Sequence, residues 1–246
     1  KDVPHGDIRN NNYYSEASQS WREMYVYTPP GYNGSNEKYP VLYLLHGGGE
    51  DQRGWANQGK TNLILDNLIA ENQAKPMIIA MLDGNVSSGG LAGFNENSLK
   101  AFENEMKQAA IPFVENKYRV KTDAESRALA GLSMGGLQTL YAGIQNTDMF
   151  SYLGVFSSGW FANNGELSGP QYAFMKEHTE KINSNLDRFF ISMGGEEDIA
   201  YQNCQVMMEK FDEIGIEYEY SEYPGGHTWP VWRHDLYKFA QLLFKE

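Results

Sequence analysis

Short apolar runs of strand length alternate with helical patterns along the chain. The runs over 39–45 and 77–82 have no polar interruption, which predicts strands buried on both faces of a sheet. The full set of predicted strands covers 24–28, 39–45, 77–82, 127–130, 152–156, 189–193 and 217–223. Most of them are followed by glycine, proline or a short polar stretch, as strand ends usually are.

Between these strands, apolar residues recur at helical spacing. The predicted helices cover 63–69, 99–118, 137–144, 172–180, 201–214 and 232–245, and Pro112 predicts a kink or a break in the longest. A Gly/Ser/Asn-rich loop is expected over 83–97 and a polar stretch over 163–169. Alternating strands and helices predict an α/β fold with a mostly parallel sheet and helices on both faces.

The chain shows no internal repeat and no linker long enough to separate two domains, so we expect a single domain over 1–246. The polar residues 1–20 are expected to form an arm on the surface of that domain. Because the chain starts at Lys1 and shows no charged-then-apolar signal segment, we expect a mature or excised chain whose export signal is no longer present.

Composition excludes several classes of protein. Of the 246 residues, 41% are hydrophobic and 13% aromatic, too many for a disordered chain. The net charge of −12 argues against nucleic-acid binding, which needs a basic face. No apolar run approaches the roughly 20 residues that span a membrane. Cys204 is the one cysteine, so an intrachain disulfide and a multi-cysteine zinc site are excluded.

The sequence GLSMGG at 131–136 carries the clearest chemical signal. It follows a predicted strand and precedes a predicted helix, the context of a G-x-S-x-G nucleophile elbow, which presents Ser133 above the sheet. The helix N-terminus points amide groups at the place where negative charge develops during acyl transfer. The alternative is a glycine-rich turn whose serine only caps the helix.

A nucleophilic serine needs a base, and the five histidines differ in setting. His227 follows the last predicted strand, where ligands meet a parallel sheet, and is the expected general base. His5 is expected at the surface and His178 in a solvated helix. His234 is expected to be structural, and His46 leads into a glycine loop.

The residue that orients the base should lie between the serine and the histidine in chain order. Asp198, Glu197 and Glu196 compete for this role after the strand 189–193, and the spacing favours Asp198, with Glu197 as the alternative. A metal site at His227 and His234 is rejected because a proline between them breaks a shared helix.

The sequence HGGG at 46–49 resembles the oxyanion element of esterases and lipases. We therefore expect the backbone amides of Gly48 and Met134 to form an oxyanion hole, although a turn without a catalytic role is the alternative. Several tryptophans near these motifs are candidates for stacking on a substrate, although each can equally be core: Trp55, Trp160, Trp229 and Trp232.

Together these motifs resemble a known family. The matching segments are HG at 5–6, YTPPGY at 27–32, YLLHG at 43–47, DNLIA at 66–70, AGLSMGG at 130–136 and GGH at 225–227. The pattern resembles the esterase D superfamily, and most of all the family 1 carbohydrate esterases, which include feruloyl and acetyl xylan esterases. The resemblance implies an α/β-hydrolase fold without a large lid, a triad of Ser133, Asp198 and His227, and no cofactor or metal.

The resemblance also implies an activity. We expect a secreted or periplasmic bacterial enzyme that hydrolyses feruloyl esters on plant cell-wall xylan or arabinoxylan, commonly beside xylanase or carbohydrate-binding domains. The alternatives within the superfamily are an acetyl xylan esterase and a siderophore or thioester esterase. From other classes, the alternatives are a non-catalytic carbohydrate-binding module and a serine peptidase. No nucleic-acid or membrane partner is expected.

Overall fold

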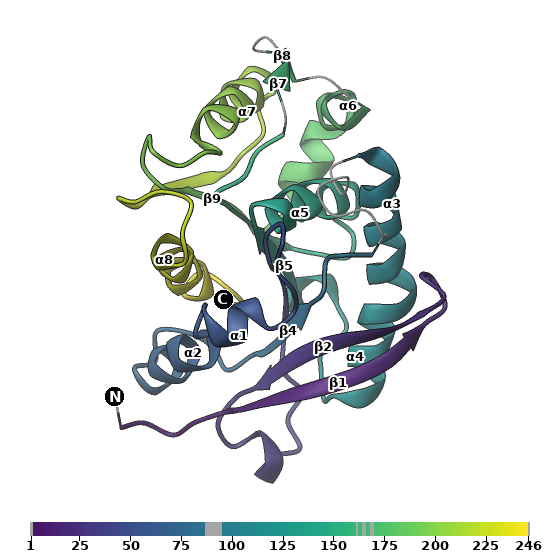
Figure 1. Ribbon diagram of the computed structural model, residues 1–246, viewed down its shortest axis with the longest axis vertical. Coiled ribbons are helices and arrows are strands. Elements are labelled where there is room, and N and C mark those ends of the chain that lie inside the picture. The colour runs from purple at the N-terminus through teal and green to yellow at the C-terminus, as the bar shows by residue number, and fades with distance from the viewer. Residues whose placement is uncertain (1, 87–94, 161, 164–165, 168–169, 246) are drawn as a thin grey trace.

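A computed structural model describes residues 2–86, 95–160, 162–163, 166–167 and 170–245 (Figure 1). Much of the loop predicted over 83–97 and part of the polar stretch over 163–169 therefore lie outside the described residues. Within the described ranges, no helix is both long enough and apolar enough to cross a lipid bilayer.

An eight-stranded sheet in the order β1-β2-β4-β3-β5-β6-β9-β10 forms the centre of the molecule. Six adjacent strands, from β4 to β10 in this order, are parallel, whereas β1 and β2 join at one side as an antiparallel pair. A short antiparallel pair lies apart from this sheet. The strands are β1 (Asp7–Ser15), β2 (Ser20–Thr28), β3 (Val41–Leu45), β4 (Ile78–Leu82), β5 (Arg127–Leu132), β6 (Tyr152–Phe156), β7 (Ala162–Asn163), β8 (Glu166–Leu167), β9 (Arg188–Met193) and β10 (Glu219–Glu222).

Helices cover both faces of the sheet, as the alternating pattern predicts (Figure 1). One face packs against α3 (Glu96–Glu105), the π-helical segment η3 (Met106–Ala110), α4 (Ile111–Lys117), α5 (Met134–Gln145), α6 (Pro170–Asn185) and α7 (Tyr201–Ile214). The other face packs against α1 (Gly54–Asn57), α2 (Thr61–Ala70) and α8 (Trp229–Ala240). Two 3₁₀ turns, η1 (Tyr32–Gly34) and η4 (Ala124–Ser126), lie in the connections.

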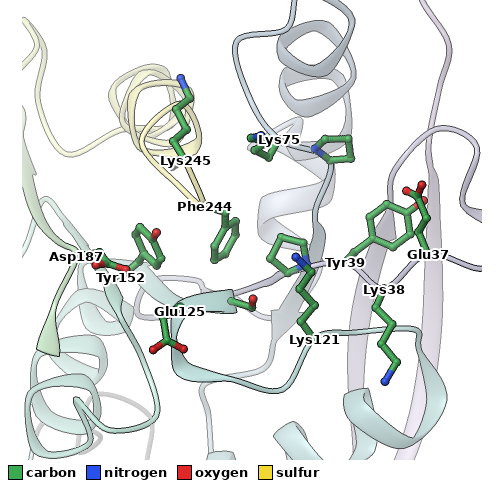
Figure 2. A pocket seen from close by; sticks show the side chains of 13 residues that line it. Glu37, Lys38, Tyr39, Lys75, Lys121, Glu125, Tyr152, Asp187, Phe244 and Lys245 are labelled. Carbon is green, nitrogen blue, oxygen red and sulfur yellow. The ribbon is translucent and has the colours of Figure 1, made fainter.

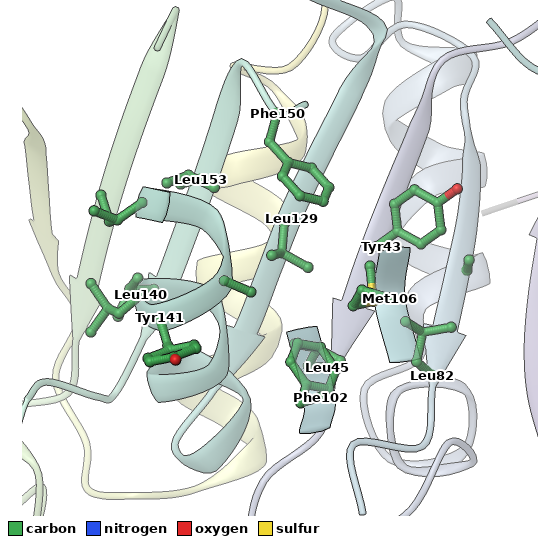
Figure 3. Packing of buried hydrophobic residues seen from close by; sticks show 14 of the residues in the cluster. Tyr43, Leu45, Leu82, Phe102, Met106, Leu129, Leu140, Tyr141, Phe150 and Leu153 are labelled. Atoms are coloured by element: carbon green, nitrogen blue, oxygen red, sulfur yellow. The ribbon is translucent and has the colours of Figure 1, made fainter. Parts of the chain in front are cut away.

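The central strands supply apolar side chains to both helical layers. In β3, Tyr43 and Leu45 join the layer that contains Phe102, while Leu42 and Leu44 join the opposite layer. Figure 3 shows the first of these layers, with Tyr43, Leu45 and Phe102 gathered between strand and helix. Because successive side chains in a strand point to opposite faces, a strand in this position must be apolar throughout. This is why its pattern predicts it so clearly.

The long helical stretch contains Pro112, as the sequence indicates, but the chain does not break there. The π-helical segment η3 connects α3 to α4, and Pro112 lies in the first turn of α4. Proline has no N–H to donate to the preceding turn, and a wider turn accommodates its ring. The last helix also differs from the prediction: it spans Trp229–Ala240 and begins three residues earlier than expected.

The expectation of a surface arm over residues 1–20 is wrong for most of that segment. Residues Asp7–Ser15 form the edge strand β1, paired along its length with β2. Its buried side chains are Asn11, Tyr13 and Ser15, two of which are polar, so the apolar alternation of a half-buried strand is hidden. Polar side chains can be buried here because the helical layer offers them hydrogen-bond partners.

Glu105 is the main partner of this strand. Its carboxylate is 2% exposed and accepts hydrogen bonds from the hydroxyls of Tyr13 (2.8 Å) and Ser15. Tyr118 donates to Asn11 at 2.9 Å in the same way. Burying a polar group costs little free energy when the group is hydrogen-bonded. This segment can therefore pack as a strand despite its polar side chains.

Asp66 fixes the residues that precede β1. This fully buried carboxylate on α2 accepts hydrogen bonds from the Tyr27 hydroxyl (2.7 Å) and the Gly6 amide (3.0 Å), and His5 Nδ1 lies 2.9 Å away. The separate motifs at 5–6, 27–32 and 66–70 therefore meet at one carboxylate.

Replacing Asp66 with alanine should lower the free energy of unfolding by about 3 kcal/mol, because the Tyr27 hydroxyl and the Gly6 amide lose a charged acceptor. Urea denaturation measures this difference. Asp148→Ala is the matched control, since Asp148 is exposed and makes no recorded side-chain contact. Equal losses in the two variants would show that Asp66 does not fix the N-terminal segment.

Candidate active site

Ser133 occupies a sharp turn between β5 and α5. Its φ of 51° and ψ of −115° lie outside the helical and extended regions, a strained conformation that is common for residues with a functional role. The turn closes because Gly131 and Gly135 touch: a Cβ on Gly131 would lie 2.4 Å from the backbone of Gly135. A larger residue at Gly131 would push α5 away from β5, and one at Gly135 would collide with Leu45 and His46 at the end of β3.

Several hydrogen bonds hold the strained serine in place. The Ser133 amide donates to Phe156 O at 2.9 Å, and Ser133 O accepts from the Ser158 hydroxyl at 2.7 Å and from the Leu137 amide at 3.1 Å. Both the strand side and the helix side of the turn are thereby anchored. The N-terminus of α5 points toward Ser133, so its amide groups favour negative charge there.

Asp198 and His227 come together beyond the carboxyl ends of β9 and β10, on the same edge of the sheet as Ser133. His227 Nδ1 lies 2.8 Å from Asp198 Oδ1, and Asp198 is 3% exposed. Both glutamates that compete with Asp198 in the sequence, Glu196 and Glu197, are exposed. The Gly195 amide donates to Gly225 O at 2.7 Å and joins the two loops.

The environment of Asp198 keeps its carboxylate ionised. Burial alone would raise the pKa of Asp198, but hydrogen bonds from His227 and the Ala200 amide, with the nearby Ser157 hydroxyl, hold it below its ordinary value. An ionised carboxylate only accepts hydrogen bonds, so His227 donates through Nδ1 and its Nε2 is left free to accept a proton.

The loop after β3 supplies amides beside the serine. An added Cβ on Gly47 would lie 3.4 Å from Ser133 Cβ, which places this loop against the turn. The Gly47 amide is already bound to Glu50 Oε2 at 3.3 Å, whereas within the described residues the amides of Gly48 and Met134 have no acceptor. The arrangement therefore leaves free the two amides that the sequence predicts for an oxyanion hole.

His46 is fully buried and supports this loop rather than acting as a second base. Its Nε2 accepts a hydrogen bond from the Gly84 amide at 2.9 Å, and its Nδ1 lies 2.7 Å from Gly47 O. The backbone at the start of the loop is also fixed, because the Gly135 amide donates to His46 O at 3.1 Å.

Glu50 is a site residue that the sequence analysis missed. Besides the Gly47 amide, it accepts a hydrogen bond from Trp229 Nε1 at 2.9 Å, so it connects the amide loop to the helix that follows His227. A glutamate at the end of a glycine loop carries no sequence signal for this role, because its partner Trp229 is 179 residues away.

The four candidate tryptophans are used mainly for packing. Trp55, Trp160 and Trp232 are only 1%, 7% and 6% exposed, so most of each ring is covered by the protein. Trp55 donates to Leu45 O at 2.8 Å, and Trp160 packs edge-on against Phe211. Trp229 is half-buried, stacks edge-on against Trp55 and Trp232, and is the one of the four that keeps exposed surface.

A cavity of about 430 Å³ lies away from this site (Figure 2). Its lining includes Tyr39, Ser126 and Tyr152, at the amino ends of the parallel strands and hence at the opposite edge of the sheet. Lys38 and Lys245 also line it, but Figure 2 shows them extending in opposite directions. Within the described part of the chain, no group of three or more His, Cys, Asp or Glu side chains is arranged to hold a metal ion.

Comparison with known proteins agrees with this geometry. The Esterase family model matches residues 15–242, so the chain belongs to the Esterase family and is a carboxylic ester hydrolase. An endo-1,4-beta-xylanase/feruloyl esterase of Xylanibacter ruminicola is 33% identical over the whole of this chain, which spans 32% of that protein. An endo-1,4-beta-xylanase Y of Acetivibrio thermocellus is 28% identical over 92% of this chain and 22% of its own length.

Solved structures show the same fold. A ferulic acid esterase from Anaeromyces mucronatus in complex with ferulic acid has a TM-score of 0.84 and 28% identity, covering 99% of this chain and 93% of that one. A serine-to-alanine mutant of the feruloyl esterase module from Clostridium thermocellum, complexed with sinapinate, has a TM-score of 0.81 and 26% identity, covering 98% and 89%. The chain has the α/β-hydrolase fold, and its described residues include no large lid.

Asp198→Asn should lower kcat for ester hydrolysis by about 10⁴, because a neutral amide no longer selects the tautomer of His227 that leaves Nε2 free. Glu197→Gln is the matched control and should stay within about twofold of wild type, since Glu197 is exposed. Steady-state rates of the two variants at pH 7 decide between the carboxylates. The reverse order would make Glu197 the orienting acid.

Proposed function

We propose that this chain hydrolyses feruloyl esters on plant cell-wall xylan through a triad of Ser133, His227 and Asp198. The observation that carries the proposal is the hydrogen bond between His227 and the buried Asp198, at the edge of the sheet where strained Ser133 is presented. Relatives named for feruloyl or ferulic acid esterase activity support the acyl group.

In the first half of the proposed reaction, Ser133 Oγ attacks the ester carbonyl carbon and its proton passes to His227 Nε2. Asp198 stabilises the imidazolium that forms, and the amides of Gly48 and Met134 donate hydrogen bonds to the oxyanion. The tetrahedral intermediate then expels the sugar hydroxyl, which takes the proton from His227. Ferulate remains attached to Ser133 as an acyl-enzyme.

In the second half, His227 accepts a proton from water, and the resulting hydroxide equivalent attacks the acyl-enzyme carbonyl. The same two amides hold the second oxyanion. Collapse of this intermediate breaks the bond to Ser133 Oγ, which regains its proton from His227, and ferulate leaves. His227 relays each proton between Ser133, the sugar hydroxyl and water, and the two amides only donate hydrogen bonds.

An aromatic acyl group needs apolar surface near the serine. Ile199 is 81% exposed directly after Asp198, and the half-buried Trp229 begins α8 two residues after His227. Exposed apolar side chains at such a position favour a hydroxycinnamoyl group over acetate. The natural partner would be a feruloylated xylan or arabinoxylan fragment, met outside the cell that secretes the enzyme.

The chain spans about a third of the Xylanibacter relative and about a fifth of the Acetivibrio relative, both of which carry xylanase in their names. We therefore place it as an esterase module that acts beside other carbohydrate-active domains. Such an arrangement would hold the esterase near xylan that a neighbouring domain has bound, which raises the local concentration of its substrate.

Wild type should release ferulate from methyl ferulate, and Ser133→Ala should reduce kcat by a factor on the order of 10⁶. Initial rates on methyl ferulate and 4-nitrophenyl acetate test the proposal, with circular dichroism to show that the variant is folded. Serine-dependent release of acetate alone would favour the alternative of an acetyl xylan esterase. Serine-independent turnover of both esters would contradict the triad.

A further inference from the structure

A second carboxyl group is buried behind Asp198. Asp235 lies on α8 with 1% of its surface exposed, and its Oδ2 has no hydrogen-bond partner among the described residues. The Ser192 hydroxyl, on β9, and the charge of Asp198 both act on its carboxyl group. In the sequence, Asp235 stands in a charged stretch of helix between His234 and Lys238, which resembles a solvated surface.

The two carboxyl groups have opposite protonation states at neutral pH. Burial raises the pKa of Asp235 to about 8; the Ser192 hydroxyl opposes this rise, and the Asp198 charge adds to it. The pKa of Asp198 is held below its ordinary value instead, mainly through its hydrogen bonds. Paired carboxyls with divergent pKa values share a site in which one stays charged and the other stays neutral.

Four buried oxygens of this region have no direct hydrogen-bond partner of good geometry: Ser157 Oγ, Ser192 Oγ, Asp198 Oδ2 and Asp235 Oδ2. A neutral Asp235 contributes an O–H donor to this set, whereas an ionised Asp235 contributes only acceptors. A buried carboxylate oxygen without a hydrogen-bond partner is costly when the group is charged. The burial of Asp235 and its unpartnered Oδ2 therefore favour the neutral acid.

We infer that Asp235 is a positioning residue for the reaction described under Proposed function: as a neutral acid behind Asp198, it keeps the single negative charge of this buried region on the carboxylate that faces His227. The inference rests on that proposed function. Asp235 acts through Asp198 and touches no reacting atom.

Loss of the Asp235 proton would place two negative charges in the same buried region. α8 begins two residues after His227, so repulsion between Asp235 and Asp198 acts on the helix that carries the base loop. The elements packed against α8 include α2, β6 and β9, and α1 through Trp55. Their ionisable groups are Asp66 on α2, Tyr152 on β6 and Arg188 on β9, and Asp66 is already bound to Tyr27 and Gly6.

The test compares wild type with Asp235→Asn, which keeps the shape of the side chain and never ionises. With methyl ferulate from pH 6 to 9.5, kcat of wild type should fall at least fivefold above pH 8 while KM changes less than twofold. The variant should keep a level kcat above pH 8. Asp148→Asn, at an exposed position, is the control and should follow wild type.

A similar alkaline fall in Asp235→Asn would overturn the inference, because another group would then cause it. A loss of kcat that is equal at every pH would also overturn it, since a purely structural role has that effect. If the asparagine variant does not fold, Asp235→Leu, which also lacks the charge, takes its place in the same pH series.

Two further measurements do not depend on turnover, so they separate this inference from a failure of the proposed function. The proton NMR signal of His227 Nδ1–H should shift near pH 8 in wild type and should not shift there in Asp235→Asn. The melting temperature of the variant should exceed that of wild type by a margin that grows from pH 4 to pH 8 and is level above it. The folded state keeps a proton on Asp235 that an unfolded aspartate loses near pH 4, so rising pH destabilises wild type only. A constant signal in wild type, or a margin independent of pH, would overturn the inference even in an enzyme with another substrate.

Discussion

The contact between Gly131 and Gly135 is the constraint on which the site depends. It brings the end of β5 against the start of α5, so that one residue must turn the chain, and that residue is Ser133 with its strained backbone. The strain is sustained because β5 is central in the sheet and apolar on both faces, and because Phe156 and Ser158 of the neighbouring strand region hold the turn. Packing over the whole sheet thus fixes the position of a single hydroxyl.

Sequence patterns predict what is local in this molecule. The buried strands are apolar at every position, and the elbow, the base and the glycine loop each lie in a short motif, so 39–45, 131–136 and 225–227 could be interpreted without a structure. What the sequence does not reveal depends on distant partners. The buried side of β1 is polar because Glu105 lies opposite it. The roles of Glu50 and Asp235 depend on Trp229 and Asp198, which lie elsewhere in the sequence. The burial of the tryptophans could not be predicted for a related reason, since spacing cannot tell a buried ring from an exposed one.

Buried carboxylates recur in this acidic chain, and each is compensated differently. Asp66 and Glu105 accept hydrogen bonds from hydroxyls or amides, and Asp198 is also bound to an imidazole. Asp235 Oδ2 has no partner among the described residues, and this carboxyl group stays protonated. The first two connect chain segments that are far apart in sequence, whereas the last two lie together behind the site. The same residue type therefore serves the fold in one place and the chemistry in another, according to the donors around it.

The two edge strands of the sheet, β1 and β10, affect how the chain can lie beside other folded units. At one edge of the sheet, β1 carries Arg9, Asn10 and Asn12 beside its open backbone groups. At the other edge, β10 is short, and Glu219 and Glu222 are exposed. Open strand edges recruit further strands, and short or charged edges discourage this pairing. A unit with such edges can be tethered close to other folded units, at high local concentration, with little tendency to aggregate by strand exchange.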